Sequence, residues 1–225
     1  MTISLIDKKD TFEIVGTRIA EILAQETLNQ QALATAAGKD PELWKFIVYS
    51  EKTNPFEAFS EEITPIVNVW YDTSNFSRKM GDPVSRQQDS AIYNIDVYAA
   101  AAATDNPAGG YNPVDQSSIS ALHRVLRLVR NIIMHPDNTY LKLSQTINGK
   151  KRNIVTERWI QSKQVFQPQI GDSPVQGVIA ARILLSVSFN ETPVVETFET
   201  LEIVGTTAKR AGDGKITFEA DFNTT

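Results

Sequence analysis

Apolar residues recur at helical spacing in two segments of this chain. The first segment runs from about Asp10 to Ala37, with apolar residues three or four positions apart at Phe12, Val15, Ile19, Ile22 and Leu23. The second runs from about Gln116 to Met134, with a stripe made of Ile119, Leu122, Val125, Leu126, Val129, Ile132 and Ile133. This spacing predicts two amphipathic helices. Gly38 and Pro136 are typical of the positions just beyond a helix end.

Four other segments have the apolar pattern of strands: Phe46–Tyr49, Ile66–Tyr71, Ala91–Ala102 and Val175–Phe189. In the last two the alternation is clear, because every second residue is apolar within 92–98 and 183–189. The order of elements predicts an α+β fold with a mixed, mainly antiparallel β-sheet flanked by the two helices. The helices are expected to pack on the sheet through Val15, Ile19, Ile22, Leu122, Leu126 and Val129.

Polar, turn-rich segments separate these elements. Asn75–Asp89 is predicted to be a long loop, and loops of this length are often functional. Asn148-Gly149 favours a tight turn, so Tyr140–Ile147 and Ile154–Phe166 are predicted to form a projecting hairpin. From Pro193 onward the chain changes in character, and Phe198–Thr207 is expected to pair with Lys215–Phe222. The predicted organisation is a domain of residues 1–192 and a C-terminal β extension of residues 193–225.

The composition is that of an ordinary globular protein. The chain has 225 residues, 41% of them apolar and 22% charged, and its net charge of -5 disfavours a general nucleic-acid binder. It contains no cysteine, which excludes disulfides and thiol chemistry. Its first residues lack the pattern of a signal peptide, and the apolar run from Val178 to Val187 is too short to span a bilayer. We therefore expect no membrane partner.

Charge is unevenly distributed along the chain. Residues 142–163 contain six bases and one acid, and the second predicted helix carries Arg124, Arg127 and Arg130 without an acid between Gln116 and Met134. Residues 189–225 contain seven acids and three bases, and residues 40–64 contain six acids and two bases. Opposite patches on one chain favour self-association, because the acidic patch of one copy can meet the basic patch of the next. The alternative is solvated surface with an accidental imbalance.

The residues that usually carry catalysis do not form a recognisable set. His123 and His135 are the only histidines, and neither has acidic or histidine neighbours at a spacing typical of a metal site. The adjacent acids Glu61 and Glu62 point apart on a helix or a strand. No phosphate-loop, nucleophile-elbow or zinc-protease motif is present. The prediction is a protein that is not an enzyme, with no catalytic residue, cofactor or metal.

The order helix, strand, strand, helix, strand, strand resembles that of the tail terminator and tail-completion proteins of long-tailed bacteriophages. The resemblance covers residues 11–191 and includes the helix at Thr11–Ala20, the strand entry at Thr64–Trp70, the strand Ile92–Tyr98 and the late strand Ala181–Phe189. It implies a mixed sheet with helices packed on it, in a subunit of a six-fold ring. The ring stops growth of the tail tube and joins the tail to the head connector.

The resemblance also implies the partners: other copies of the chain in a homo-hexamer, the tail tube protein, possible sheath contact, and the connector. DNA would pass through the ring without sequence-specific binding, and the protein would be assembled in the host cytoplasm and reside in the virion. The residues expected to make subunit or partner contacts are Arg78, Lys79, Arg86, Lys150, Lys151, Arg152, Phe198, Leu201 and Ile203. Apolar residues of the extension are expected to add to a neighbour's sheet edge. The alternatives are a head-completion protein of the connector side and a small cytosolic enzyme.

Overall fold

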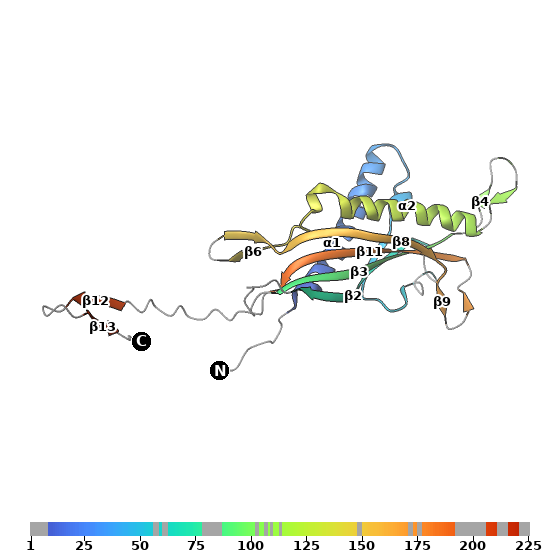
Figure 1. Ribbon diagram of the computed structural model, residues 1–225. Coiled ribbons are helices and arrows are strands. Elements are labelled where there is room, and N and C mark those ends of the chain that lie inside the picture. The colour runs from blue at the N-terminus through green and yellow to red at the C-terminus, as the bar shows by residue number, and fades with distance from the viewer. Residues whose placement is uncertain are drawn as a thin grey trace. The chain divides into compact units, whose positions relative to one another are not determined.

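The chain divides into two compact units, residues Lys9–Thr192 and residues Met1–Lys8 with Pro193–Thr225. The computed structural model describes residues 9–55, 59, 63–77, 87–101, 104–105, 108, 110–112, 114–147, 150–170, 173–174, 177–191, 206–210 and 216–220. In the smaller unit, β12 (Thr206–Arg210) pairs antiparallel with β13 (Ile216–Ala220). The larger unit contains the sheet and both long helices (Figure 1).

The larger unit has the predicted α+β fold. Its sheet has the strand order β1-β2-β3-β11-β8. These strands are β1 (Ile47–Ser50), β2 (Ile66–Ser77), β3 (Gln87–Ala100), β11 (Val178–Glu191) and β8 (Val155–Phe166). β1 runs parallel to β2, and the other three pairings are antiparallel. The short strand β1 and the long strand β8 are therefore the two edges of this sheet.

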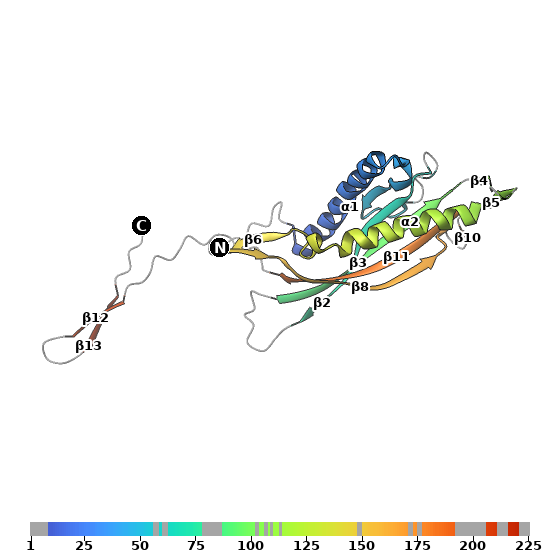
Figure 2. The same ribbon diagram turned by 90° about the horizontal axis from the view of Figure 1, so that it is seen from above.

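Helices α1 (Thr11–Ala36) and α2 (Val114–Met134) cover one face of the sheet (Figure 2). α1 begins with a backbone N–H of Asp10 that donates to Glu13 Oε2 at 2.9 Å, as in a capping box. It ends where Gly38 takes a φ of 66° and the Lys39 N–H donates to the Ala34 carbonyl. Both helices are confirmed, with ends within a few residues of the predicted ones.

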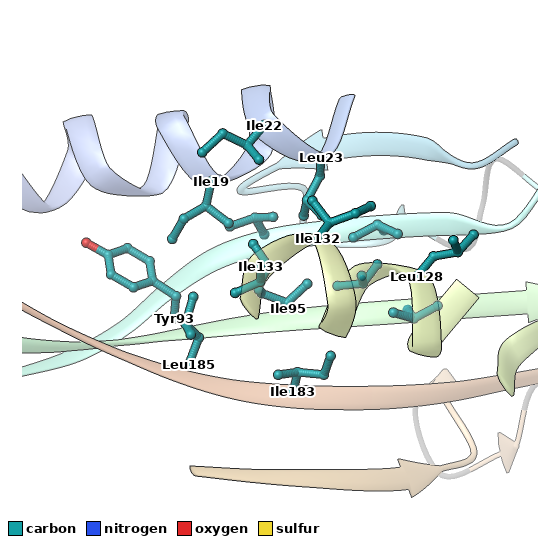
Figure 3. Close-up of a cluster of buried hydrophobic side chains, with 14 of the residues drawn as sticks. Ile19, Ile22, Leu23, Tyr93, Ile95, Leu128, Ile132, Ile133, Ile183 and Leu185 are labelled. Atoms are coloured by element: carbon teal, nitrogen blue, oxygen red, sulfur yellow. The ribbon is translucent and has the colours of Figure 1, made fainter. Parts of the chain in front are cut away.

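The core lies between the helices and the sheet. Figure 3 shows Ile19, Ile22 and Leu23 of α1 and Leu128, Ile132 and Ile133 of α2 gathered near Tyr93, Ile95, Ile183 and Leu185 of the sheet. Of the six helix residues predicted to pack on the sheet, Val15, Ile19, Ile22, Leu122 and Val129 are buried. Leu126 also packs against this core, but at its margin, where its side chain is only half-buried.

The opposite face of the sheet is partly covered by the connection from β1 to β2. Phe59 of this connection packs against Ile66, Tyr98 and Ala180. Asn68 of β2 fixes the start of the connection, since its side chain bonds both the N–H and the carbonyl of Lys52. A parallel strand pair requires such a crossover.

A buried ion pair lies on the same face. Arg182 of β11 binds Asp96 of β3 through two hydrogen bonds of 2.7 and 2.8 Å. Asp96 also accepts from the indole N–H of Trp70 and the hydroxyl of Tyr98. The guanidinium lies 4.9 Å from the Trp70 ring centroid and 5.6 Å from that of Phe166. Side chains of four neighbouring strands are thereby held together.

Short elements complete the larger unit. They are the 3-10 helices η1 (Pro41–Trp44) and η3 (Pro136–Asn138) and the strand pairs β4 (Thr104–Asp105) with β5 (Tyr111–Asn112), β6 (Ser144–Ile147) with β7 (Lys150–Asn153), and β9 (Gln169–Ile170) with β10 (Ser173–Pro174).

The predicted hairpin between Tyr140–Ile147 and Ile154–Phe166 is wrong in its pairing. β6 pairs with β7, whereas β8 pairs with β11. Leu141 and Lys142 have φ values of 51° and 53°, a left-handed conformation that stops a strand, and Leu141 is fully buried. The hairpin is therefore short, and the second predicted arm extends the main sheet.

The predicted loop Asn75–Asp89 is also shorter than expected. β2 continues to Ser77 and β3 begins at Gln87, with Asn75 opposite Ser90 and Phe76 opposite Asp89. Backbone pairing extends this ribbon although its side chains are mostly polar. Residues 78–86 of the predicted loop lie outside the described part of the chain.

Candidate assembly surface

Among the described residues, three of the expected contact residues lie together. Lys150, Lys151 and Arg152 lie together on β7, and the side chains of the last two are exposed. The other six, Arg78, Lys79, Arg86, Phe198, Leu201 and Ile203, lie outside the described residues. The structure therefore does not test whether these six share a surface.

Within the described ranges, no group of three or more His, Asp or Glu side chains is placed to hold a metal ion. His123 is exposed on α2, and His135 Nδ1 accepts from the backbone N–H of Asp137 at 3.3 Å. In the same part of the chain, no helix is long and apolar enough to cross a membrane.

A groove of about 850 Å³ lies between α1 and α2. Ile22 and Leu28 line it from α1, and Leu128 and Ile132 line it from α2. Its rim carries the exposed ion pair of Arg18 and Glu21, together with amide side chains of both helices. The groove thus combines apolar walls with a polar rim.

The surface most suited to assembly lies along the edge strand β8. All 12 residues of β8 form an edge that is paired only with β11 among the described residues. Eight of its side chains are exposed: Thr156, Glu157, Trp159, Gln161, Ser162, Lys163, Gln164 and Val165. A long edge strand presents unpaired backbone N–H and carbonyl groups that can pair with another chain.

Basic side chains from α2 border this edge. A groove of about 480 Å³ is lined by His123, Leu126, Arg127, Arg130, Asn131 and Lys163. A second groove, of about 360 Å³, shares Arg130 and Lys163 with the first and adds Trp159 and Met134. Arg127, Arg130 and Lys163 form no ion pair with any residue that the structure describes. We call β8 together with these α2 residues the β8 surface.

The β8 surface also displays apolar side chains. Trp159 is 63% exposed, Val165 is 50% exposed, and Met134 at the end of α2 is 38% exposed. Tryptophan and methionine are enriched in protein interfaces relative to the rest of a protein surface. Unpaired cations, exposed apolar groups and a free backbone edge thus occur side by side.

Arg158 anchors β8 to α2. Its guanidinium donates to the carbonyls of Ile133 and His135 at the end of α2, and its Nε donates to the Thr139 carbonyl. The carbonyls of Ile133 and His135, at the end of α2, have no partner within the helix, so a cation is favourable there. Burial lowers the pKa of Arg158 from its ordinary value. Arg158 therefore fixes the edge relative to the basic row.

Sequence reasoning identified the basic row of α2 but missed the edge beside it. The spacing of Arg127 and Arg130 was visible, whereas nothing in the sequence showed that Lys163 lies next to them. Because β8 was predicted to pair within a hairpin, its position at the edge of the main sheet was not predicted. Arg158 carried no local signal, because its partners are carbonyls 19 to 25 positions away.

A buried carboxyl, that of Asp89, and a half-buried one, that of Glu191, lie near the start of α1. Asp89 is 2% exposed and accepts from the hydroxyl of Ser74 at 2.8 Å, while Glu191 accepts from the Thr11 N–H at 3.4 Å. Asp89 Oδ1 and Glu191 Oε2 are buried without a hydrogen-bond partner. Burial raises the pKa of both carboxyls, and their mutual repulsion and Asp10 raise that of Glu191 further.

This pair gives a prediction for the pH dependence of stability. The pKa of Asp89 is raised in the folded state. The stability that the protonated carboxyl contributes is therefore fully present below the ordinary carboxyl pKa, and it is lost as pH rises through the pKa of the folded state. Asp89→Asn keeps an acceptor for Ser74 and removes the charge. We expect its Tm to exceed that of the wild type at pH 7 and the difference to vanish near pH 4.

Calorimetry between pH 4 and pH 8 measures this difference. Asp137→Asn is a matched control, because Asp137 is exposed on η3 and its substitution should leave the pH profile unchanged. An Asp89→Asn protein that is less stable than the wild type at pH 7 would show that the ionised carboxylate is stabilising.

No protein-family model matches the chain, and no curated protein is significantly similar to it.

Proposed function

We propose that this chain is a structural subunit of a bacteriophage virion, a tail terminator that forms a hexameric ring at the head–tail junction. The ring caps the tail tube, and in a contractile tail also the sheath, and joins it to the head connector. In this proposal the subunit has no enzymatic activity and needs no cofactor or metal. It assembles in the host cytoplasm and allows DNA to pass through the lumen without reading its sequence.

The observation that carries the proposal is the layered arrangement of the larger unit. Two helices cover one face of a mixed sheet, in the chain order α1, β2, β3, α2, β8, β11. This is the arrangement that the resemblance to tail terminators implies. The β8 surface supports a role in assembly, since a ring subunit needs a partly apolar and charged surface that remains free in the single chain.

Electron microscopy of particles made with and without this gene product tests the proposal. Without the protein, we expect tails of uncontrolled length that do not join heads. Expression of the wild-type chain from a plasmid should restore tails of normal length. Tails of normal length that join heads in its absence would contradict the proposal. Normal-length free tails beside full heads would instead favour a head-completion protein of the connector side.

A further inference from the structure

The β8 surface has the features of a receptor for one extended chain segment. The outer edge of β8, which pairs with no further strand among the described residues, is 12 residues long, whereas β1 at the other edge of the sheet has four. Lys163 and the register shifts of β8 against β11 disfavour indiscriminate pairing, because charges and bulges protect edge strands. A strand that pairs here must therefore bring opposite charge.

The side chains around the edge specify the chemistry of the partner. Arg127, Arg130 and Lys163 lie on the helix-covered side of β8 and have no described ion-pair partner. Trp159, which lines a groove together with Arg130 and Lys163, is 63% exposed. The complementary partner is an extended segment with acidic residues for the cations and apolar or aromatic residues for the tryptophan.

The chain itself contains such a segment. Residues 194–204 have the sequence VVETFETLEIV, with Glu196, Glu199 and Glu202 and no base. The remaining residues are β-branched, aromatic or leucine, which favours an extended strand. The 11 residues of this segment match the 12 residues of β8 in length.

We propose that residues 194–204 of one copy add as a strand to the β8 edge of a second copy, with Glu196 and Glu202, which share one face of a strand, against Arg127, Arg130 and Lys163. This inference deepens the proposed function and rests on it for the expectation that copies associate. It identifies the acceptor edge, which the sequence did not reveal, and the charges that select its occupant.

The connection to this segment is short. Only Thr192 and Pro193 separate it from Glu191, the last residue of β11. The Cα atoms of Glu191 and Val194 are three steps apart, so they can lie at most about 11 Å from each other. The position beyond β8 lies two strand spacings, about 9.6 Å, from β11. A connection within one copy would therefore be almost fully extended and leave no residue for the reversal of direction that pairing requires, whereas a second copy imposes no such limit.

Cross-linking of the full chain tests this inference, because the natural chain has no cysteine. One protein carries Ser162→Cys on β8, and a second, larger by an affinity tag, carries Thr200→Cys. The two proteins are mixed and treated with a short bis-maleimide. We expect a product that contains one chain of each kind. As a matched control, Ser50→Cys on the edge strand β1 should give roughly ten-fold less product with Thr200→Cys, since it lacks the basic row.

A charge swap tests the selectivity. Arg127→Glu with Arg130→Glu should reduce cross-linking roughly ten-fold, because like charges then face each other. Adding Glu196→Lys with Glu202→Lys to the partner chain should restore it. Circular dichroism verifies that each variant is folded.

Three results would overturn the inference. They are the absence of the mixed product in folded proteins, equal yields for Ser50→Cys and Ser162→Cys, and a cross-link within one chain when both cysteines are on it. The outcome is separable from that of the virion experiment. A specific mixed product together with normal tails in the absence of the gene product would refute only the tail-terminator function.

Discussion

Replacing Asp96 by alanine is expected to lower the free energy of unfolding by about 3 kcal/mol, near the lower end of the range for breaking a buried ion pair. Asp96 is 1% exposed and bonds three side chains, those of Arg182, Trp70 and Tyr98. Its loss leaves the Arg182 guanidinium without its counter-charge on a partly covered face of the sheet. We expect a loss near the lower end of that range because the Arg182 side chain is 33% exposed, so water can solvate part of its unpaired charge.

Urea denaturation measures this loss, and two further variants define its origin. Asp137→Ala removes an exposed carboxylate and should change the free energy of unfolding by less than about 0.5 kcal/mol. Asp96→Ala combined with Arg182→Met should be more stable than Asp96→Ala alone, because no unpaired charge is then left on the sheet. If the double variant is instead less stable than the single one, the loss comes from packing and not from an unpaired charge.

The helices and the central strands could be predicted because their positions follow from local periodicity. The stripe of α2 and the alternation of β3 and β11 each place one set of side chains against the core. Such patterns identify a face without knowledge of the rest of the fold. The α+β fold class was predicted from these apolar patterns, and the structure confirms it.

The position of β8 in the sheet could not be predicted, because most of its side chains face solvent and therefore show no clear apolar pattern. Its central residues alternate only weakly, and Asn148-Gly149 gave a convincing local turn that pointed to the wrong partner. The choice between β6 and β11 as the partner of β8 depends on contacts far away in sequence. Local turn chemistry alone does not contain this information.

Of the candidate site, only the row of basic residues was predicted from the sequence. The arginines of α2 were visible as a row without acids, but their combination with Lys163 and Trp159 depends on how α2 lies over β8. That arrangement is fixed by Arg158, whose bonds join β8 to the end of α2. A surface built from two elements far apart in sequence thus becomes visible only when both are placed.

Leu122 and Leu126 of α2 show that a sequence pattern does not reveal how completely a residue is covered. They also give the second prediction of large effect. Both belong to the apolar stripe of α2, yet Leu122 is fully buried and Leu126 is half-buried at the groove of the β8 surface. A stripe of period 3.6 is wider than the part of the helix that the sheet covers, so its margin remains accessible.

Leu122→Ala is therefore expected to cost about 2–5 kcal/mol of stability, the usual loss when a cavity is left in a packed core. Leu126→Ala should cost less than half as much, because water and neighbouring side chains can fill the space at the margin. The pair serves as its own control, since the two substitutions delete the same atoms from the same helix. Urea denaturation of both variants measures the difference. Equal losses would mean that Leu126 is covered as completely as Leu122 in solution, which an occupied β8 surface would produce.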